Sequence, residues 1–265
     1  MKLLAQSLKD GKVELIEAPS PVVKKGHLLI STSCSAISSG TERMLVEFGK
    51  SNLINKAISQ PDKVSDALNK IKSEGFLSTL NAINSKLNTP ITLGYSNVGI
   101  VISKGEDVLG FDIGDRVVSN GYHAEQVLVP KNLCCKIPSS VSDEDASFSV
   151  IGSIALQGIR LASPNYGEKY LVIGLGIIGQ IATQLLQSNG CEVFAIDTNK
   201  KRCLIAKNSG IKTLHLKSEE DVISWMFDNT NGVGFDGVLV AASSNNSSPV
   251  KLAAKVSRQK GSIVL

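Results

Sequence analysis

This sequence has few histidines and no cysteine pair with metal-site spacing. These two features argue against a metal site built from imidazoles and against disulfide bridges. Only three histidines occur among the 265 residues, which nearly excludes a metal site built from several imidazoles. None of the cysteines has C-x-x-C spacing, so we expect buried thiols rather than bridges. The five cysteines are Cys34, Cys134, Cys135, Cys191 and Cys203.

Charge and hydropathy exclude two further classes of partner. The 28 basic and 24 acidic residues are scattered and leave a net charge of +4, with aromatic residues at 5%. This footprint is too weak for a nucleic-acid-binding surface. No stretch approaches the roughly 18 consecutive apolar residues of a membrane span, and the apolar run after Met1 is too short for a signal peptide. We therefore expect a cytoplasmic protein without nucleic-acid or membrane partners.

What the sequence does contain is the composition of a globular protein, with hydrophobic residues at 42%. Short alternating apolar runs over residues 3–35 and 91–129 predict the β-strands of a barrel. Between them, over about 44–90, apolar residues recur every three or four positions, which predicts two or three helices inserted into that barrel. We place this first domain at residues 1–145.

The remainder of the chain alternates apolar runs with helical patterns. Ser142 precedes Asp145 by three residues, which predicts a helix start, and the apolar run that follows reaches Ala162. Five apolar runs from Tyr170 to Leu265 then alternate with helical segments, as expected for a parallel sheet covered by helices. We place this second domain at residues 146–265. We expect it to be incomplete at its fifth strand, because such sheets normally have six strands.

A glycine-rich run in the second domain predicts nucleotide binding. The strand Tyr170–Ile173 leads directly into a turn and a helix, and the residues of the turn are Gly174, Leu175, Gly176, Ile177, Ile178 and Gly179. In a dinucleotide-binding loop the first glycine permits the tight turn, the second leaves room for the pyrophosphate, and the third lets helix and strand pack closely. The helix N-terminus then faces the phosphates. These six residues are our cofactor-binding candidates; a methyltransferase, whose cofactor loop is also glycine-rich, is the main alternative.

An acidic residue at the end of the next strand indicates which dinucleotide is bound. Asp197 lies 18 positions after Gly179 (197 − 179), where a carboxylate accepts hydrogen bonds from the ribose and repels a 2′-phosphate. The sequence therefore predicts NAD as the cofactor and makes NADP the weaker choice. Lys200, Lys201 and Arg202 oppose this reading if they pair with a 2′-phosphate; otherwise they cover the first turn of the next helix. We include Arg202 among the cofactor-binding candidates.

Several segments together resemble one family. They are Gly26–Glu42, Gly94–Gly99, the run Phe111–Pro130 with its Gly-Asp-Arg-Val motif, and the nucleotide loop. They are similar to the medium-chain dehydrogenase/reductase superfamily, the zinc-type alcohol dehydrogenases. The resemblance spans the chain and implies a GroES-like barrel, which holds the catalytic site, followed by a Rossmann domain, which holds the cofactor. The helical insertion departs from the usual layout of that family.

The family's zinc ligands are missing from this sequence. In zinc-dependent members the ligands occupy positions that match Ser39, Tyr95 and Ser153 here, and the four-cysteine structural zinc lobe is absent too. Hydroxyl groups are poor substitutes for thiolate and imidazole ligands. The resemblance therefore implies a zinc-independent enzyme, and we expect no metal site.

Three residues of the first domain are candidates for catalysis. Tyr95 is a candidate hydrogen-bond donor or general acid, Thr41 an orienting hydroxyl, and His123 a further catalytic group. The structural alternative for Tyr95 and Thr41 is an ordinary polar group of the barrel, and for His123 it is a solvated histidine of a turn. We expect an NAD-dependent oxidoreductase that moves hydride between the nicotinamide and a carbonyl or alcohol of a small molecule. A catalytically silent dinucleotide-binding sensor or docking module is the alternative.

Three short segments resemble a narrower group within this superfamily. Residues 41–50, 60–64 and 129–134 are similar to bacterial bi-domain oxidoreductases, in which such a module precedes a domain of the glucose-fructose oxidoreductase type. This implies a sugar or sugar nucleotide of polysaccharide synthesis as substrate, and a C-terminal oxidoreductase domain as partner. We accordingly expect an N-terminal fragment with weak cofactor binding and little turnover alone. An apolar last strand left as a sheet edge favours pairing with another chain, including a second copy.

Overall fold

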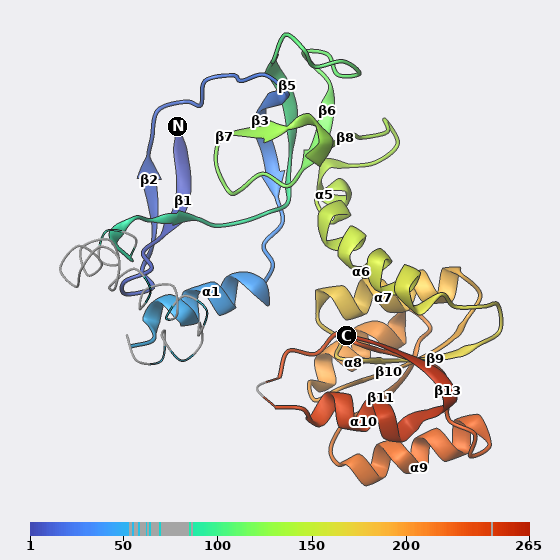
Figure 1. Ribbon diagram of the computed structural model, residues 1–265. Coiled ribbons are helices and arrows are strands. Elements are labelled where there is room, and N and C mark those ends of the chain that lie inside the picture. Colours follow the sequence, from blue (N-terminus) through green and yellow to red (C-terminus); the bar gives the residue numbers. More distant parts are fainter. Residues whose placement is uncertain are drawn as a thin grey trace. The chain divides into compact units, whose positions relative to one another are not determined.

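The computed structural model describes residues 1–52, 87–244 and 246–265, together with the single positions 55, 58, 62, 64, 69 and 85. The chain divides into two compact units, Met1–Val150 and Ile151–Leu265, which are described separately (Figure 1). The sequence places this boundary at residue 145. Most of the predicted helical insertion lies outside the described residues.

Two antiparallel sheets form the first unit, as the alternating apolar runs predict. The larger sheet has the order β7-β3-β5-β6-β8, and its strands are β3 (His27–Ser35), β5 (Asn97–Lys104), β6 (Arg116–Ser119), β7 (Gln126–Pro130) and β8 (Cys134–Lys136). The smaller sheet has the order β2-β1-β4, with strands β1 (Lys2–Gln6), β2 (Val13–Glu17) and β4 (Ile91–Thr92). Alternate residues of β3, β5 and β7 point inward and bury one core, to which Leu28, Ile30, Val101 and Val127 contribute.

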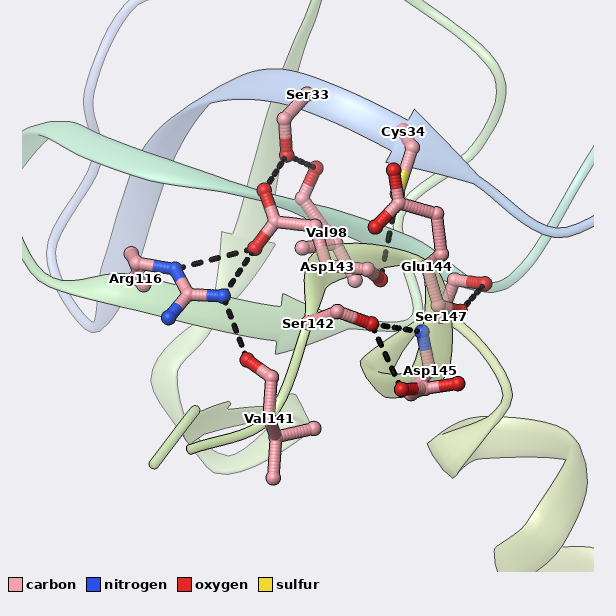
Figure 2. Close-up of polar contacts among 10 residues, drawn as sticks. All are labelled: Ser33, Cys34, Val98, Arg116, Val141, Ser142, Asp143, Glu144, Asp145 and Ser147. Atoms are coloured by element: carbon pink, nitrogen blue, oxygen red, sulfur yellow. Dashed lines mark hydrogen bonds and ion pairs between the residues drawn. The ribbon is translucent and has the colours of Figure 1, made fainter. Parts of the chain in front are cut away.

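Short helices connect these strands. Helix α1 (Thr41–Lys50) follows β3, the 3-10 helix η1 (Lys131–Leu133) follows β7, and α5 (Asp143–Ala146) follows β8. Helix α5 begins where the capping pattern predicts, because the Ser142 hydroxyl accepts a hydrogen bond from the Asp145 backbone N–H. Its first residue, Asp143, lies between strands of the larger sheet: Figure 2 shows its carboxylate between Ser33 of β3 and Arg116 of β6.

The second unit is a five-stranded parallel sheet between two layers of helices. The order is β11-β10-β9-β12-β13, and the strands are β9 (Lys169–Ile173), β10 (Glu192–Asp197), β11 (Lys212–His215), β12 (Phe235–Val240) and β13 (Ser257–Val264). Side chains of α6 (Ser149–Ala162), α7 (Ile177–Ser188) and α8 (Lys200–Asn208) pack on one face. Helices α9 (Glu219–Thr230) and α10 (Ser248–Val256) cover the other face (Figure 1), and their side chains belong to a second core.

The strand order reverses at the centre of this sheet, between β9 and β12. In open parallel sheets, dinucleotides bind at such a reversal, outside the carboxyl ends of the strands. The predicted fold class, a GroES-like domain followed by a Rossmann sheet, is confirmed. No helix within the described ranges is both long and apolar enough to cross a membrane.

The expectation that all five thiols are buried is wrong. Cys191 and Cys203 are buried, Cys34 and Cys134 are partly exposed, and Cys135 is exposed. Among the described residues, strand β8 pairs with β6 at one edge of its sheet, and Cys135 and Lys136 on it are exposed. Burial raises the pKa of the Cys134 thiol to about 12, so this side chain is an inert thiol at neutral pH.

Candidate functional site

The glycine-rich loop leaves β9 and enters α7 with the geometry of a phosphate-binding turn. Gly174 has a φ of +95°, a left-handed conformation that a side chain would strain. A Cβ atom there would also lie 2.7 Å from the Ala242 backbone nitrogen, so no larger residue fits. Gly176 is the N-cap of α7, and the N–H groups of the helix's first turn have no partner within the helix. This end of α7 is therefore suited to an anion.

The other two glycines differ in what surrounds them. A Cβ atom on Gly179 would lie 1.9 Å from the Gly174 carbonyl oxygen, so this glycine is required for the helix to pack against the turn. A Cβ atom on Gly176 would meet nothing within 4 Å. The space in front of Gly176 is open, as a site that receives a pyrophosphate requires.

Asp197 is the last residue of β10, and its carboxylate is hydrogen-bonded to the backbone of the glycine-rich loop. One carboxylate oxygen, Oδ2, accepts a hydrogen bond of 2.7 Å from the Leu175 backbone N–H. The other, Oδ1, accepts one of 2.6 Å from the N–H of Asn199. The side chain is 6% exposed. Each carboxylate oxygen can accept more than one hydrogen bond, so acceptor capacity for ribose hydroxyls remains.

The basic residues after β10 begin helix α8, as the structural alternative in the sequence predicted. Arg202 nevertheless lies beside the acid, with its Nη1 atom 3.6 Å from Asp197 Oδ2. The Gln180 amide donates a hydrogen bond of 2.9 Å to the Arg202 carbonyl oxygen and so connects α7 to α8. The structure thus brings together the nucleotide loop, Asp197 and Arg202.

A cavity lies beside this loop within the second unit. Its volume is about 520 Å³, within the usual size of ligand pockets. Its walls include Ser153 and Gln157 of α6, Ile178 of α7, and Ala241 at the end of β12. Apolar side chains form most of the lining, with Ser153 and Gln157 as polar groups at one wall.

The catalytic candidates all belong to the first unit, where His123 is not a solvated turn residue. Its side chain is 9% exposed, and both ring nitrogens have partners. Nδ1 lies 2.8 Å from the Ser35 hydroxyl oxygen, and Nε2 lies 3.1 Å from Glu42 Oε2. The ring also packs against Gly94, where an added Cβ atom would lie 2.7 Å from it.

His123 therefore connects the segments that carry the two other candidates. Tyr95, partly buried, directly follows Gly94, and Thr41, exposed, is the first residue of α1 and directly precedes Glu42. Sequence reasoning missed Ser35 and Glu42. Glu42 stands in a run matched to the family's ligand segment, which was a usable signal, whereas nothing in the sequence marks Ser35.

The positions matched to the zinc ligands of zinc-dependent family members supply neither thiolate nor imidazole donors. The three matched positions, Ser39, Tyr95 and Ser153, carry hydroxyl groups. Among the residues that the structure describes, no group of three or more His, Cys, Asp or Glu side chains could hold a metal ion. A tetrahedral zinc site requires such donors.

Two family models match this chain. The model described as alcohol dehydrogenase GroES-like domain matches residues 68–139, and the model described as zinc-binding dehydrogenase matches residues 178–265. The first match falls in the unit of antiparallel sheets and the second in the parallel sheet.

Curated relatives match over part of their length. D-guloside 3-dehydrogenase of Escherichia coli (strain K12) is 34% identical over 150 residues, which cover 49% of this chain and 43% of that protein. (R,R)-butanediol dehydrogenase of Bacillus subtilis (strain 168) is 25% identical over 171 residues, 54% of this chain and 49% of that protein. The chain spans about half the length of these relatives.

Solved structures match over nearly the whole chain. Alcohol dehydrogenase TADH from Thermus sp. ATN1 has a TM-score of 0.77 at 22% identity and is matched over 100% of this chain and 76% of its own. A mycobacterial protein complexed with NADPH has a TM-score of 0.71 at 21% identity, over 100% of this chain and 73% of its own. At these identities the likeness shows the fold.

Proposed function

The chain belongs to the medium-chain dehydrogenase/reductase superfamily, and from this we propose that it binds NAD(H) and takes part in hydride transfer between the nicotinamide and a carbonyl or alcohol. NAD(P) binding is typical of this superfamily. The observation that carries the proposal is the glycine-rich loop, in which Gly176 faces open space at the start of α7. Bound in this unit, the cofactor supplies or accepts the hydride.

We assign the cofactor contacts as follows. The backbone of the loop and the first turn of α7 hold the pyrophosphate, and Asp197 accepts hydrogen bonds from the adenosine ribose. Two backbone N–H groups hold the carboxylate of Asp197 in place, and its charge opposes a 2′-phosphate. The 520 Å³ cavity beside α7 receives the nicotinamide half.

In the first unit, hydroxyl groups take the place of a metal ion. We propose a zinc-independent reaction in which Tyr95 donates a hydrogen bond to the substrate oxygen and Thr41 orients the substrate. His123 contributes by position: its ring supports Gly94 beside Tyr95 and binds Glu42 beside Thr41.

The substrates in the names of three relatives support a class of substrate for this chain. D-guloside 3-dehydrogenase, (R,R)-butanediol dehydrogenase and sorbitol dehydrogenase are named for glycosides and polyols, and each matches about half of this chain. We propose a sugar derivative or polyol as substrate, in agreement with the resemblance to bi-domain oxidoreductases. That resemblance also supports a second oxidoreductase domain as partner.

A pair of glycine variants tests the cofactor site. Gly176→Val places a side chain in open space, so it should leave the thermal stability unchanged but weaken NADH binding at least about tenfold by filling the phosphate site. Gly152→Val in α6, which also meets open space, should change neither property and is the control. Binding is measured by NADH fluorescence titration.

The outcomes separate the alternatives. Wild-type protein that binds neither NADH nor NADPH, or Gly176→Val protein that binds NADH normally, would refute the assignment. Binding without oxidation of the cofactor across a panel of aldehydes, ketoses and oxidised glycosides would favour the silent sensor or docking module.

A further inference from the structure

Three polar side chains form a continuous hydrogen-bonded chain in the first unit, and only the position of one of them, His123, enters the proposed hydride-transfer site. Ser35 ends β3, His123 precedes β7, and Glu42 lies in the first turn of α1. The Ser35 hydroxyl lies 2.8 Å from His123 Nδ1, and His123 Nε2 lies 3.1 Å from Glu42 Oε2. Both distances are hydrogen-bond distances.

The direction of these hydrogen bonds follows from their chemistry. An ionised carboxylate can only accept a hydrogen bond. The N–H group at Nε2 of His123 therefore donates a hydrogen bond to Glu42. In the neutral ring Nδ1 then bears the lone pair, and the Ser35 hydroxyl donates to it. This is the donor order of a serine whose proton is removed by a histidine that a carboxylate orients.

The acid and the base are held rigidly. Glu42 is 7% exposed, and its second oxygen, Oε1, accepts a hydrogen bond of 2.8 Å from the Ser38 backbone N–H. The His123 backbone is fixed on both sides, because its N–H donates to Leu93 and its carbonyl oxygen accepts from Leu4. A fixed base is what general-base activation of a hydroxyl requires.

Ser35 and His123 both line an open surface depression of about 330 Å³ in the same unit, and Lys2 and Glu125 are among its other residues. Leu3, Leu4 and Leu15 contribute apolar wall, and the depression involves none of the nucleotide-loop residues. Its size suits a small apolar group. The serine at the end of the hydrogen-bonded chain is therefore accessible to a ligand.

We propose that Ser35 is an activated nucleophile that accepts the acyl group of small carboxylic esters. Ser35 Oγ attacks the ester carbonyl carbon while its proton passes to His123 Nδ1. The carbon–oxygen bond to the alcohol breaks, His123 returns the proton to the departing oxygen, and an acyl-serine remains. Water then attacks the acyl carbon and gives a proton to Nδ1. The bond between that carbon and Ser35 Oγ breaks, the carboxylic acid leaves, and His123 returns the proton to Oγ, which restores Ser35. The reaction needs no nicotinamide and is independent of the proposed function.

The experiment uses p-nitrophenyl acetate and protein without added cofactor. We expect release of nitrophenolate, with peptide mass mapping that finds the acetyl group on Ser35. Ser33, exposed on the same strand and hydrogen-bonded to Asp143 rather than to a histidine, is an internal control that should stay unmodified.

Variants then test the relay. His123→Gln should slow acetylation of Ser35 about a hundredfold, as loss of a general base does, and Glu42→Gln should slow it at least about tenfold. His27→Gln is the matched control, since His27 Nδ1 lies 2.7 Å from the Lys25 carbonyl oxygen and, in the part of the chain that the structure describes, its ring has no carboxylate or serine partner. It should leave the rate unchanged.

The proposal is overturned if Ser35 of the wild-type protein stays unmodified, if Ser33 reacts equally fast, or if His123→Gln protein acetylates Ser35 at the wild-type rate. Should a variant at a buried position fail to fold, the wild-type map still decides between Ser35 and Ser33.

Discussion

At the scale of single residues, the buried ring of His123 restricts which residue can stand at position 94. Its ring leaves no room for a side chain at residue 94, and Gly94 also adopts a left-handed backbone conformation with a φ of +93°. Two separate requirements therefore keep this position a glycine. Tyr95 directly follows this glycine in the chain.

We predict that Gly94→Ala destabilises the first unit more than a matched variant does. The control is Gly110→Ala, whose φ of +87° is similar but whose Cβ atom would meet nothing within 4 Å. Left-handed strain alone costs about 1–2 kcal/mol, and overpacking against the His123 ring adds at least about 1 kcal/mol at residue 94. Urea unfolding of both variants measures the difference. Equal losses would contradict the contact between Gly94 and His123.

Asp197 decides, in our proposal, between the two nicotinamide cofactors. We predict that the wild-type protein binds NADH more tightly than NADPH, because the ionised carboxylate opposes a 2′-phosphate. Asp197→Ser removes that charge and should reduce the preference at least about tenfold, as loss of a like-charge contact of about 1.4 kcal/mol would do. Fluorescence titrations with both cofactors give the ratio of affinities.

A control for this measurement is Asp228→Ser, on the exposed surface of α9, which should keep the wild-type ratio. A wild-type protein that binds NADPH as tightly as NADH would reject the assignment of Asp197. The basic residues at the start of α8, Arg202 above all, would then hold the phosphate.

At the scale of elements, an ion pair is one of the contacts that attach helix α5 to the larger sheet. Asp143 accepts hydrogen bonds from the Ser33 hydroxyl at 2.6 Å and from Arg116 at 2.5 Å, and Arg116 also donates to the Val141 carbonyl oxygen (Figure 2). The side chains of Asp143 and Arg116 are 28% and 35% exposed, so water screens the pair only in part. Helix α5 has four residues and could not persist without such contacts.

We predict a pH-dependent contribution from this pair. Hydrogen bonding from Ser33, followed by that from Arg116, lowers the pKa of Asp143 in the folded protein. A carboxyl group of this kind stabilises the fold above its unfolded pKa, about 3.9, and loses the contribution as the pH falls through its lower folded pKa. Asp143→Asn should therefore cost about 1–3 kcal/mol at neutral pH, and the difference from wild type should shrink below about pH 4.

Chemical unfolding of both proteins across this pH range gives the measurement. Glu47→Gln, which breaks the exposed pair of Arg43 and Glu47, is the control and should change the free energy of unfolding by less than about 1 kcal/mol. A difference between wild type and Asp143→Asn that stays constant at acid pH would show that the carboxylate charge does not stabilise α5.

At the scale of the whole molecule, the candidate residues are divided between two units with separate cores. The first unit carries Thr41, Tyr95 and His123, and the second carries the nucleotide loop and Asp197. Each unit thus supplies one part of the proposed reaction. In our proposal, the cofactor binds to the parallel sheet, and hydroxyl groups of the antiparallel unit bind the substrate.

We predict that the purified protein carries no stoichiometric zinc, because serine and tyrosine stand at the three positions that match the family's ligands. Metal analysis after expression in zinc-supplemented medium should find far less than about one zinc per chain, the content of a catalytic site. A chelator should leave NADH binding unchanged. A zinc content near one per chain would show that Ser39, Tyr95 and Ser153 were matched to the wrong positions.

The sequence by itself determined the parallel sheet, its nucleotide loop and the start of α5, because these features depend on neighbours in the chain. A strand, three glycines and a helix N-terminus lie within about twenty residues, and the spacing of apolar residues reports local secondary structure directly. The Ser142 cap and the acid at Asp197 follow from the same short-range patterns. Both features could therefore be predicted from the sequence without knowledge of any tertiary contact.

Only the tertiary structure decided which side chains surround His123. Ser35 and Glu42 lie 88 and 81 positions away from it in the chain, and they meet it through the packing of β3 and α1. The register of antiparallel strands depends on long-range pairing, which no local spacing records. For the same physical reason the sequence could not show that a histidine in a glycine-rich turn would be buried, paired at both nitrogens and packed against Gly94.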